Sequence, residues 1–215
     1  MIKNDFLRNL SDQVYLGWDT ETEGLNHVRS RPWQISYALF KNGSVLEIDG
    51  EPQVFDRYIY WEDINVSGDA AEITGFDKDD YMERAIDPDK VLEEFNEYLY
   101  DSEIINFGHN ILGFDIYMHK VLSTESGVDH DWNYLTNSLD TLCLARGYKS
   151  NEKPDFDNFL AWQFRMLKKR SRGNKLEELG KEFDIEFDKS KLHSAVEDVK
   201  LNAKVMKHFL NIYDI

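Results

Sequence analysis

The sequence predicts an α/β fold that opens with three antiparallel strands and continues mainly as helices. Two apolar segments, WQISYALF (residues 33–40) and SVLEID (residues 44–49), are joined by Asn42-Gly43, the strongest short signal for a β-hairpin. From residue 87 onward, apolar residues recur at helical spacing behind helix-capping residues. Because no internal repeat or long linker divides the 215 residues, residues 1–215 are predicted to form a single domain.

The other predicted strands also follow from short apolar runs. VYLGW at residues 14–18 is the first strand of the chain, and PQVFDRYIYW at residues 52–61 is a candidate after the hairpin. EIINF at residues 103–107 predicts a short buried strand that leads into GHNILGFD.

The helices are predicted from caps and from one apolar face. DAAE at residues 69–72 predicts a short capped helix, and Asp87 followed by Pro88 predicts the start of a longer one. The buried face of that longer helix is predicted to carry Val91, Leu92, Phe95 and Leu99. Further helices are predicted in residues 139–148, 158–172 and 174–183.

The last helix is predicted from a capping box. Ser194 and Glu197 have the S-x-x-E spacing, which makes Ala195 the first helical residue. The predicted buried face carries Ala195, Val199, Ala203, Met206 and Leu210.

Composition limits the compartment and the partners. The chain has no apolar run long enough to cross a membrane and no signal-peptide pattern, so a cytoplasmic protein with no membrane partner is expected. The single cysteine, Cys143, excludes an internal disulfide and is predicted to be buried in a helix. The net charge of −16 argues against broad, salt-driven binding to nucleic acid.

Acidic residues gather at the end of the first predicted strand, in DTETEGL. Asp19 and Glu21 are two residues apart and therefore share one face of the strand, where their charges repel. Such a pair usually has hard divalent cations to neutralise it. Glu23 is followed at once by Gly24, so we interpret it as a solvated or supporting residue and not as a ligand.

Two further motifs carry candidate site residues. His193 precedes the last helix and Asp198 lies one turn inside it, so the cap lets a histidine and a carboxylate converge on one site. Asp115 in GHNILGFD follows the buried strand and lies near a helix start, where an acidic residue can also serve only the helix dipole. In the same motif, a structural hydrogen bond is expected for His109.

In this order, DTETEGL, GHNILGFD and HSAVED resemble the motifs of the DnaQ-like DEDD exonucleases, histidine subtype, of the ribonuclease H-like superfamily. The resemblance spans residue 15 to about residue 210. It implies a mixed central sheet, with three antiparallel strands first and parallel strands after them, flanked by helices. It also implies 3′–5′ exonuclease activity with two divalent cations, Mg²⁺ or Mn²⁺, as cofactors.

The resemblance assigns roles to five residues. Asp19 would bridge both metals, Glu21 and Asp198 would complete the first, and Asp115 would act on the second. His193 would take the proton from the attacking water, and the product would be a 5′-mononucleotide from a 3′ end. The tyrosine subtype is not matched, because Ser194 stands four residues before Asp198.

Substrate contacts are predicted at six positions. By resemblance, Leu25 and Thr74 touch the terminal nucleotide, and Asn110 lies near the substrate. The segment RMLKKRSRGNK, residues 165–175, holds six basic and no acidic residues. It is either a solvated helix end or a track for strand phosphates, with Lys168, Lys169 and Arg170 as its contacts.

The sequence thus predicts a free-standing exonuclease for single-stranded DNA or mismatched 3′ ends, as in proofreading and DNA repair. An RNA-trimming enzyme, similar to oligoribonuclease or ribonuclease T, stays open because recognition of a 2′-hydroxyl cannot be predicted from motifs. A catalytically silent nucleic-acid-binding module is the other alternative, and the presence of all five site residues argues against it. A compact, acidic exonuclease of this kind would suit a bacterial cell or a phage-infected host. A polymerase or replication partner and the oligomeric state are left open.

Overall fold

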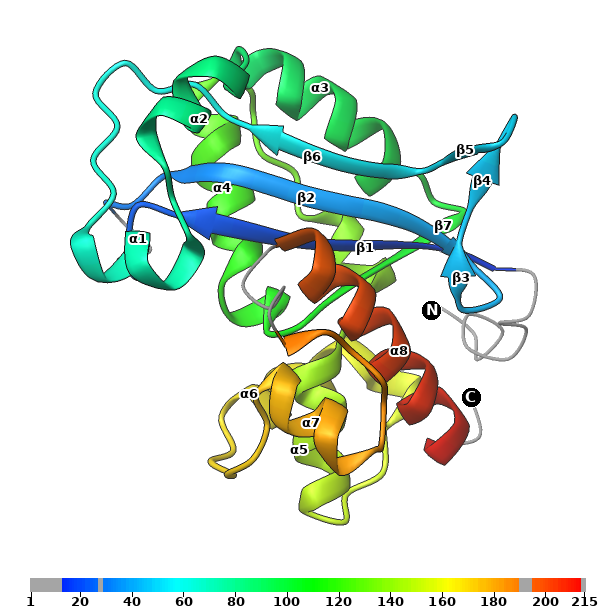
Figure 1. Cartoon of the computed structure of the whole chain (residues 1–215). Helices are drawn as coiled ribbons and strands as arrows, with labels where there is room; N and C mark the ends of the chain where they lie inside the picture. Colours follow the sequence, from blue (N-terminus) through cyan, green and yellow to red (C-terminus); the bar gives the residue numbers. More distant parts are fainter. Residues whose placement is uncertain (1–12, 27–28, 190–194, 214–215) are drawn as a thin grey trace.

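The computed structural model describes residues 13–26, 29–189 and 195–213 (Figure 1). Its strands are β1 (Val14–Thr22), β2 (Pro32–Lys41), β3 (Ser44–Val45), β4 (Glu47–Ile48), β5 (Glu51–Pro52), β6 (Val54–Tyr58), β7 (Ile104–Gly108) and β8 (Ser138–Asp140). Its α-helices are α1 (Gly68–Thr74), α2 (Lys78–Arg84), α3 (Pro88–Leu99), α4 (Asp115–Glu125), α5 (Thr141–Lys149), α6 (Phe159–Leu167), α7 (Leu176–Glu182) and α8 (Ala195–Tyr213). Short 3₁₀ turns lie at η1 (Ile111–Gly113), η2 (Asn133–Asn137) and η3 (Phe156–Asn158).

The central sheet is mixed, as the resemblance implied. Its strand order is β3-β2-β1-β7-β8, with β6 also paired to β2. The β1–β2 pair is antiparallel, whereas β1–β7 and β7–β8 are parallel. The predicted α/β class with antiparallel strands followed by parallel strands is therefore confirmed.

The predicted third strand, residues 44–49, is wrong as a continuous element. Only β3 stays on the edge of β2; the chain then leaves the sheet as the β4–β5 ribbon and returns as β6 farther along the same edge. The cause is a second tight turn at Asp49-Gly50, where both residues have positive φ angles of 53° and 84°. This Asp-Gly pair is a hairpin signal that the sequence interpretation passed over.

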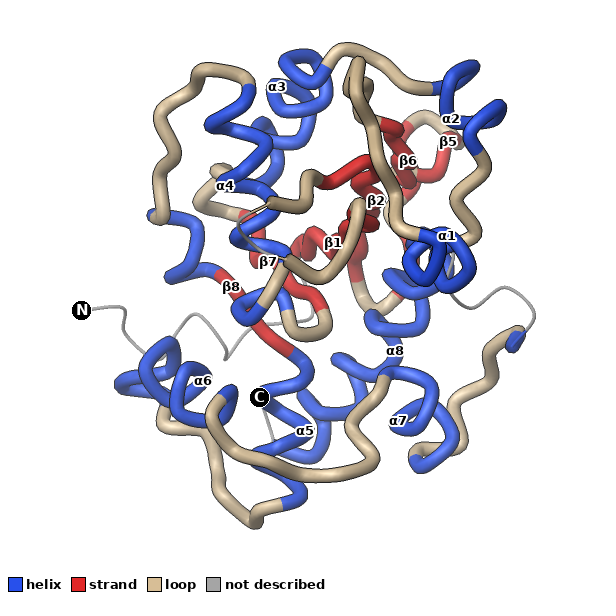
Figure 2. Tube along the Cα trace, turned by 90° about the vertical axis from the view of Figure 1, so that its left-hand side faces the viewer, coloured by secondary structure: helices blue, strands red, loops and turns tan. Residues whose placement is uncertain are grey.

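Helices cover both faces of the sheet (Figures 1 and 2). Along β1 the side chains alternate: Tyr15 packs in the hydrophobic cluster formed with α5, α6 and α8, while Leu16 and Trp18 pack in the cluster formed with α3 and α4. The sheet is therefore buried on both faces.

Most helix predictions agree with the structure. Asp87 caps α3, and the four predicted apolar residues of that helix are its buried residues. The helix α8 begins at Ala195 and buries all five predicted positions, although Ser194 of the capping box lies outside the described residues. The helix predicted over residues 158–172 ends earlier, at Leu167, and the carbonyl of Leu167 accepts a hydrogen bond from the Arg146 guanidinium at 2.6 Å. No helix in the described part of the chain is long and apolar enough to span a bilayer.

Candidate active site

Asp19 and Glu21 lie near the carboxyl end of β1. They are half-buried and continue the strand face that carries Tyr15, which is the face that α8 covers. Between them, Thr20 points to the opposite face. The predicted side-by-side placement of the two carboxylates follows from the regular register of β1 with β2 up to Glu21.

Asp115 is hydrogen-bonded directly to the end of β1. It is the first residue of α4 and is buried, and its Oδ1 accepts hydrogen bonds from the Thr20 amide at 3.0 Å and from the Thr20 hydroxyl at 2.6 Å. Thr20 therefore holds the Asp115 carboxylate beside Asp19 and Glu21. This threonine is a positioning residue that motif matching alone did not single out.

Asp198 joins the cluster from α8. It lies in the first turn of that helix, between the buried residues Ala195 and Val199. His193, the predicted general base, lies outside the described residues, so the histidine subtype stays a prediction.

The charges of the neighbouring acids act on Asp19 and Glu21. Burial raises the pKa of Asp19 well above its ordinary value, and the charges of Asp115, Glu21 and Asp198 raise it further. Burial, followed by the charges of Asp198 and Asp115, raises the pKa of Glu21 to about 8. The pKa of Asp115 is raised to about 7 by burial, against the lowering effect of the Thr20 hydrogen bonds. A set of acids that disfavour one another's charge is a candidate cation site.

A second buried acid holds the loop that precedes Asp115. Asp140 caps α5 through the Leu142 amide, and it also accepts hydrogen bonds from the amides of Asn110 and Leu112. Burial raises its pKa to about 6, although these amide donors oppose the shift. Asp140 therefore fixes the turn at Asn110, whose φ of 69° is left-handed, and through it the start of α4.

His109 is a structural residue, as expected. Its Nδ1 lies 3.0 Å from the Thr141 hydroxyl, which also contacts Asn202 of α8 at 2.7 Å. Burial lowers the pKa of His109 to about 4, so the ring is neutral at pH 7. The His109–Thr141–Asn202 chain links the GHNILGFD loop to the helix that carries Asp198.

Glu23 is neither solvated nor simply the end of the acidic run. Its carboxylate accepts hydrogen bonds from the Arg31 guanidinium and amide and from the Asn65 amide, and these hydrogen bonds hold its pKa below the ordinary value against the opposing effect of burial. The Glu23 carbonyl also accepts from the Ser67 amide, at the start of α1. Of the two interpretations of Glu23, the solvated one is wrong and the supporting one agrees with these contacts. The half-buried Arg31, eight residues later, supplies a counter-charge that no local motif indicated.

The contacts of Glu23 with Arg31, Asn65 and Ser67 form a strap that joins the end of β1 to α1. The predicted contacts to the terminal nucleotide come from two segments beside this strap. Leu25 is 87% exposed, and Thr74 ends α1, where its hydroxyl donates to the Ala70 carbonyl at 2.9 Å. An 87% exposed leucine at a strand end is an apolar surface available to a ligand.

The basic segment is divided by ion pairing. Arg165 and Lys169 both pair with Glu152. Within the described residues, Lys168 and Arg170 have no ion-pair partner. A phosphate would have to compete with Glu152 for Lys169, but not for Lys168 or Arg170.

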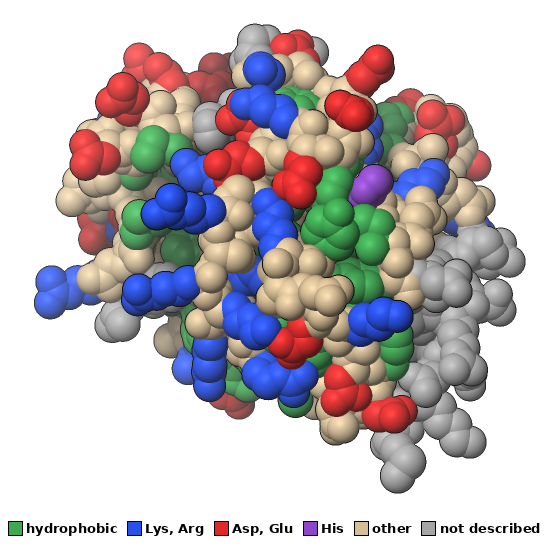
Figure 3. Space-filling model, turned by 90° about the horizontal axis from the view of Figure 1, so that it is seen from below, with side chains coloured by type: hydrophobic (Ala, Val, Ile, Leu, Met, Phe, Trp, Pro, Cys, Tyr) green, Lys and Arg blue, Asp and Glu red, His purple; other side chains and the backbone are tan. Residues whose placement is uncertain are grey.

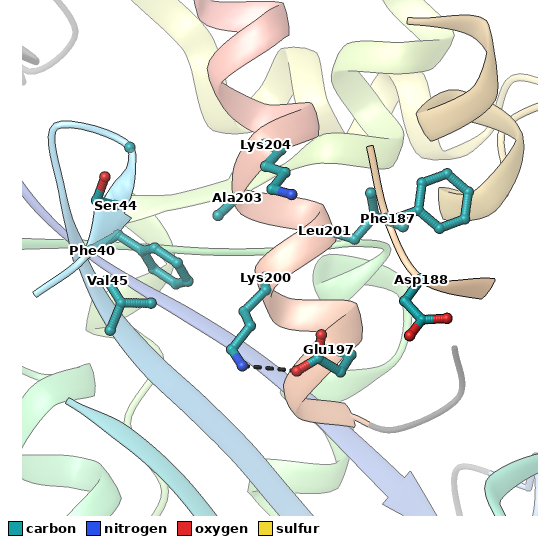
Figure 4. Close-up of a pocket in the computed structure, with 11 residues that line it drawn as sticks. Phe40, Ser44, Val45, Phe187, Asp188, Glu197, Lys200, Leu201, Ala203 and Lys204 are labelled. Atoms are coloured by element: carbon teal, nitrogen blue, oxygen red, sulfur yellow. Dashed lines mark hydrogen bonds and ion pairs between the residues drawn. The ribbon is translucent and has the colours of Figure 1, made fainter. Parts of the chain in front are cut away.

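Two cavities lie on different sides of the first turns of α8. One, of about 850 Å³, has Asp198, Asn110 and His109 in its wall together with residues 171–178. The other, of about 400 Å³, lies between the β2–β3 hairpin and α8, where Lys200 pairs with Glu197 (Figure 4). Only the larger cavity contains predicted site residues.

The donors at the end of β1 fit divalent cations by their chemistry. Carboxylate oxygens are the ligands that Mg²⁺ and Mn²⁺ prefer, and bound cations would relieve the repulsion that raises the pKa values. Among the described residues, no group of three or more His, Cys, Asp or Glu side chains is already arranged to hold a metal ion. The fit therefore rests on donor chemistry and on the shared charge of the cluster.

Comparison with known proteins decides the family. The sequence model of the exonuclease family, RNase_T, matches residues 16–206. The chain belongs to the exonuclease family. The predicted membership of an exonuclease family is confirmed, and with it the prediction that the chain is an exonuclease.

Solved structures show the same fold. A structure of exonuclease I superposes with a TM-score of 0.69 at 18% identity, over 94% of this chain and 43% of that one. The zinc-bound complex of E. coli exonuclease I with single-stranded DNA gives a TM-score of 0.70 at 18% identity, over 94% of this chain and 42% of that one. A complex of exonuclease I with SSB-Ct gives 0.63 at 17% identity, over 94% and 43%. The chain thus spans less than half the length of these relatives, and no curated protein sequence matches it significantly.

Proposed function

We propose that the chain is a metal-dependent 3′–5′ exonuclease that releases 5′-mononucleotides from single-stranded or mismatched 3′ ends of DNA. The observation that carries this proposal is the gathering of Asp19, Glu21, Asp115 and Asp198 at one end of the sheet, where Asp115 and Asp198 act electrostatically on both Asp19 and Glu21. Membership of the exonuclease family supports the reaction type. The DNA complex of E. coli exonuclease I, which has the same fold, supports the substrate class.

The four carboxylates would hold two divalent cations, Mg²⁺ or Mn²⁺. When bound, two such ions activate a water on one side of the phosphorus and stabilise the leaving 3′-oxygen on the other. Thr20 keeps Asp115 in place for this task, and Asp140 keeps the preceding loop in place. His193 would accept the proton of the attacking water.

The remaining predicted residues would orient the strand. Leu25 and Thr74 would contact the terminal nucleotide, Asn110 would lie beside the scissile region, and Lys168, Lys169 and Arg170 would meet strand phosphates. The cytoplasmic location and a polymerase or replication partner stay predictions.

The test uses single strands of DNA and RNA of the same sequence, labelled at the 5′ end. Incubation with Mg²⁺ or Mn²⁺ should produce a ladder that shortens from the 3′ end, with DNA degraded faster than RNA. Chelator and the His193→Ala variant should abolish the ladder. Faster degradation of RNA would assign the chain to RNA trimming, and intact strands with both metals would overturn the enzymatic proposal in favour of a silent binding module.

A further inference from the structure

The larger cavity is lined by Asp198, by the His109–Asn110 turn, by Leu142 and Arg146 of α5, and by residues 171–178. Figure 2 shows α5 and α7, which flank this cavity, in the lower part of the molecule, whereas α1 lies beside the strand ends. Because the cavity shares Asp198 with the carboxylate cluster and Asn110 with the predicted substrate contacts, a strand whose terminal nucleotide lies at Leu25 and Thr74 can extend into it.

Basic side chains line the cavity, and two of them have no acidic partner among the described residues. Arg146, Arg172 and Lys175 line it. Arg146 is engaged with the carbonyls of Leu167 and Met166, but Arg172 and Lys175 form no side-chain ion pair with any described residue. The side chains of Arg172 and Lys175 are therefore available to pair with a bound anion.

The same wall carries three acids, Glu177, Glu178 and Asp198. Glu177 pairs with Lys181 one turn later in α7, and Glu178 accepts a hydrogen bond from the Lys175 amide at 2.9 Å. Asp198 belongs to the carboxylate cluster, where bound cations would offset its charge.

The turn that carries the two cations is pre-organised. The Lys149 ammonium donates to the carbonyls of Gly173 and Arg172 and pairs with Glu182. Gly173 has a φ of 72°, and a Cβ there would lie 2.9 Å from the Lys149 Nζ. Asn174, which is buried, donates its amide to the Ser171 carbonyl at 3.0 Å. Pre-ordering of this kind lowers the entropy that binding would otherwise cost.

We propose that this cavity is the subsite for the phosphates upstream of the scissile bond, with Arg172 and Lys175 as the phosphate contacts and Lys149 as the positioning residue of their turn. The inference rests on the proposed function and specifies where the strand backbone lies. It moves the main contacts from Lys168–Arg170, which lie outside the cavity wall, to the next basic residues of the same segment.

The test compares the Arg172→Gln/Lys175→Gln double variant with Lys41→Gln/Lys90→Gln, which removes the same charge. Lys41 of β2 lies opposite Val14 in the sheet, at the other end of β1 from Asp19, and Lys90 lies on α3. With a 20-nucleotide single strand, the first variant should raise KM about tenfold. The slope of the logarithm of the binding constant against the logarithm of the salt concentration should become shallower by roughly 1.4, because each phosphate contact on a single strand contributes about 0.7. Its kcat and its KM for a trinucleotide should not change.

An equal rise in KM for both double variants, or a loss confined to kcat, would overturn the subsite. Anisotropy of a labelled 20-mer in chelator measures the same contact without cleavage. Weakened binding there, in a protein that cleaves neither strand with either metal, would support the subsite while refuting the exonuclease proposal. Unchanged binding of the Arg172→Gln/Lys175→Gln variant would refute the subsite whatever the activity.

Discussion

The two halves of the chain carry opposite charge. Residues 1–140 hold 29 acidic and 10 basic residues, a net charge of −19, whereas residues 141–215 hold 12 acidic and 15 basic residues, a net charge of +3. The first half supplies Asp19, Glu21 and Asp115, and the second half supplies α5 to α8. Lys and Arg side chains gather on the face of the second half that Figure 3 shows.

This difference resolves the objection that a net charge of −16 raises against nucleic-acid binding. Net charge describes long-range attraction, which salt screens beyond about 10 Å, whereas a strand end is held by local contacts. An acidic half suits cations and an adjoining basic half suits a phosphate backbone. Asp198, on α8, is the acidic residue that the second half brings to the first.

The largest expected effect is on chemistry in the acidic half. Asp19→Asn should lower kcat by about 10³-fold, because a carboxylate that helps to hold the cations supports several kcal/mol of transition-state stabilisation. Glu62→Gln removes one acidic charge at an exposed position outside the cluster and should leave kcat within about twofold. Steady-state rates on single-stranded DNA measure both, and similar losses in the two variants would show that overall charge, not the cluster, matters.

The second effect is a pH-dependent stability of the metal-free protein. Above about pH 4 the unfolded chain has released the protons of Asp115 and Glu21, while the native state still binds them until about pH 7 to 8. Raising the pH from 5 to 8 should therefore lower the free energy of unfolding. Asp115→Asn, which cannot ionise, should remove part of this loss, on the order of 1–3 kcal/mol at pH 8.

Urea unfolding in chelator at several pH values measures this effect. Mn²⁺ should reverse the trend, because cations favour the ionised carboxylates. A metal-free stability that rises between pH 5 and 8 and is unaffected by Asp115→Asn would contradict the perturbed cluster.

The third effect concerns the strap that joins the end of β1 to α1. Arg31→Met leaves the Glu23 carboxylate, which is 8% exposed, without its counter-charge and should cost about 2 kcal/mol of stability. Arg57→Met breaks a more exposed pair with Glu94 and should cost about 0.5–1 kcal/mol. Thermal unfolding of both variants decides the order, and a smaller loss for Arg31→Met would show that the strap is not structural.

The sequence predicted the parts of the site that depend on local spacing. The period of a strand places Asp19 and Glu21 on one face, and the start of α8 at Ala195 was predicted from Ser194 and Glu197. The Asp87 cap was predicted for the same reason, since a cap concerns residues only two or three positions apart.

The contacts that the sequence did not predict join distant segments. Thr20 meets Asp115 across 95 positions, and Arg31 reaches both Glu23 and the segment before α1. The second use of Asp140, as an acceptor for the Asn110 and Leu112 amides, likewise depends on how β7 and β8 pair. The division of the basic segment by Glu152 is of the same kind, because partner choice is fixed only by the packing of α6.

The division of labour between the two halves is tested most directly by measuring DNA affinity and single-turnover cleavage in the same variants. Asp19→Asn should bind a labelled single strand at least as tightly as the unmodified chain and cleave it about 10³-fold more slowly. Arg172→Gln/Lys175→Gln should bind about tenfold more weakly and cleave at an unchanged rate once saturated. If Asp19→Asn weakened binding and the basic-half variant slowed cleavage at saturation, the assignment of metal chemistry to one half and backbone binding to the other would be contradicted.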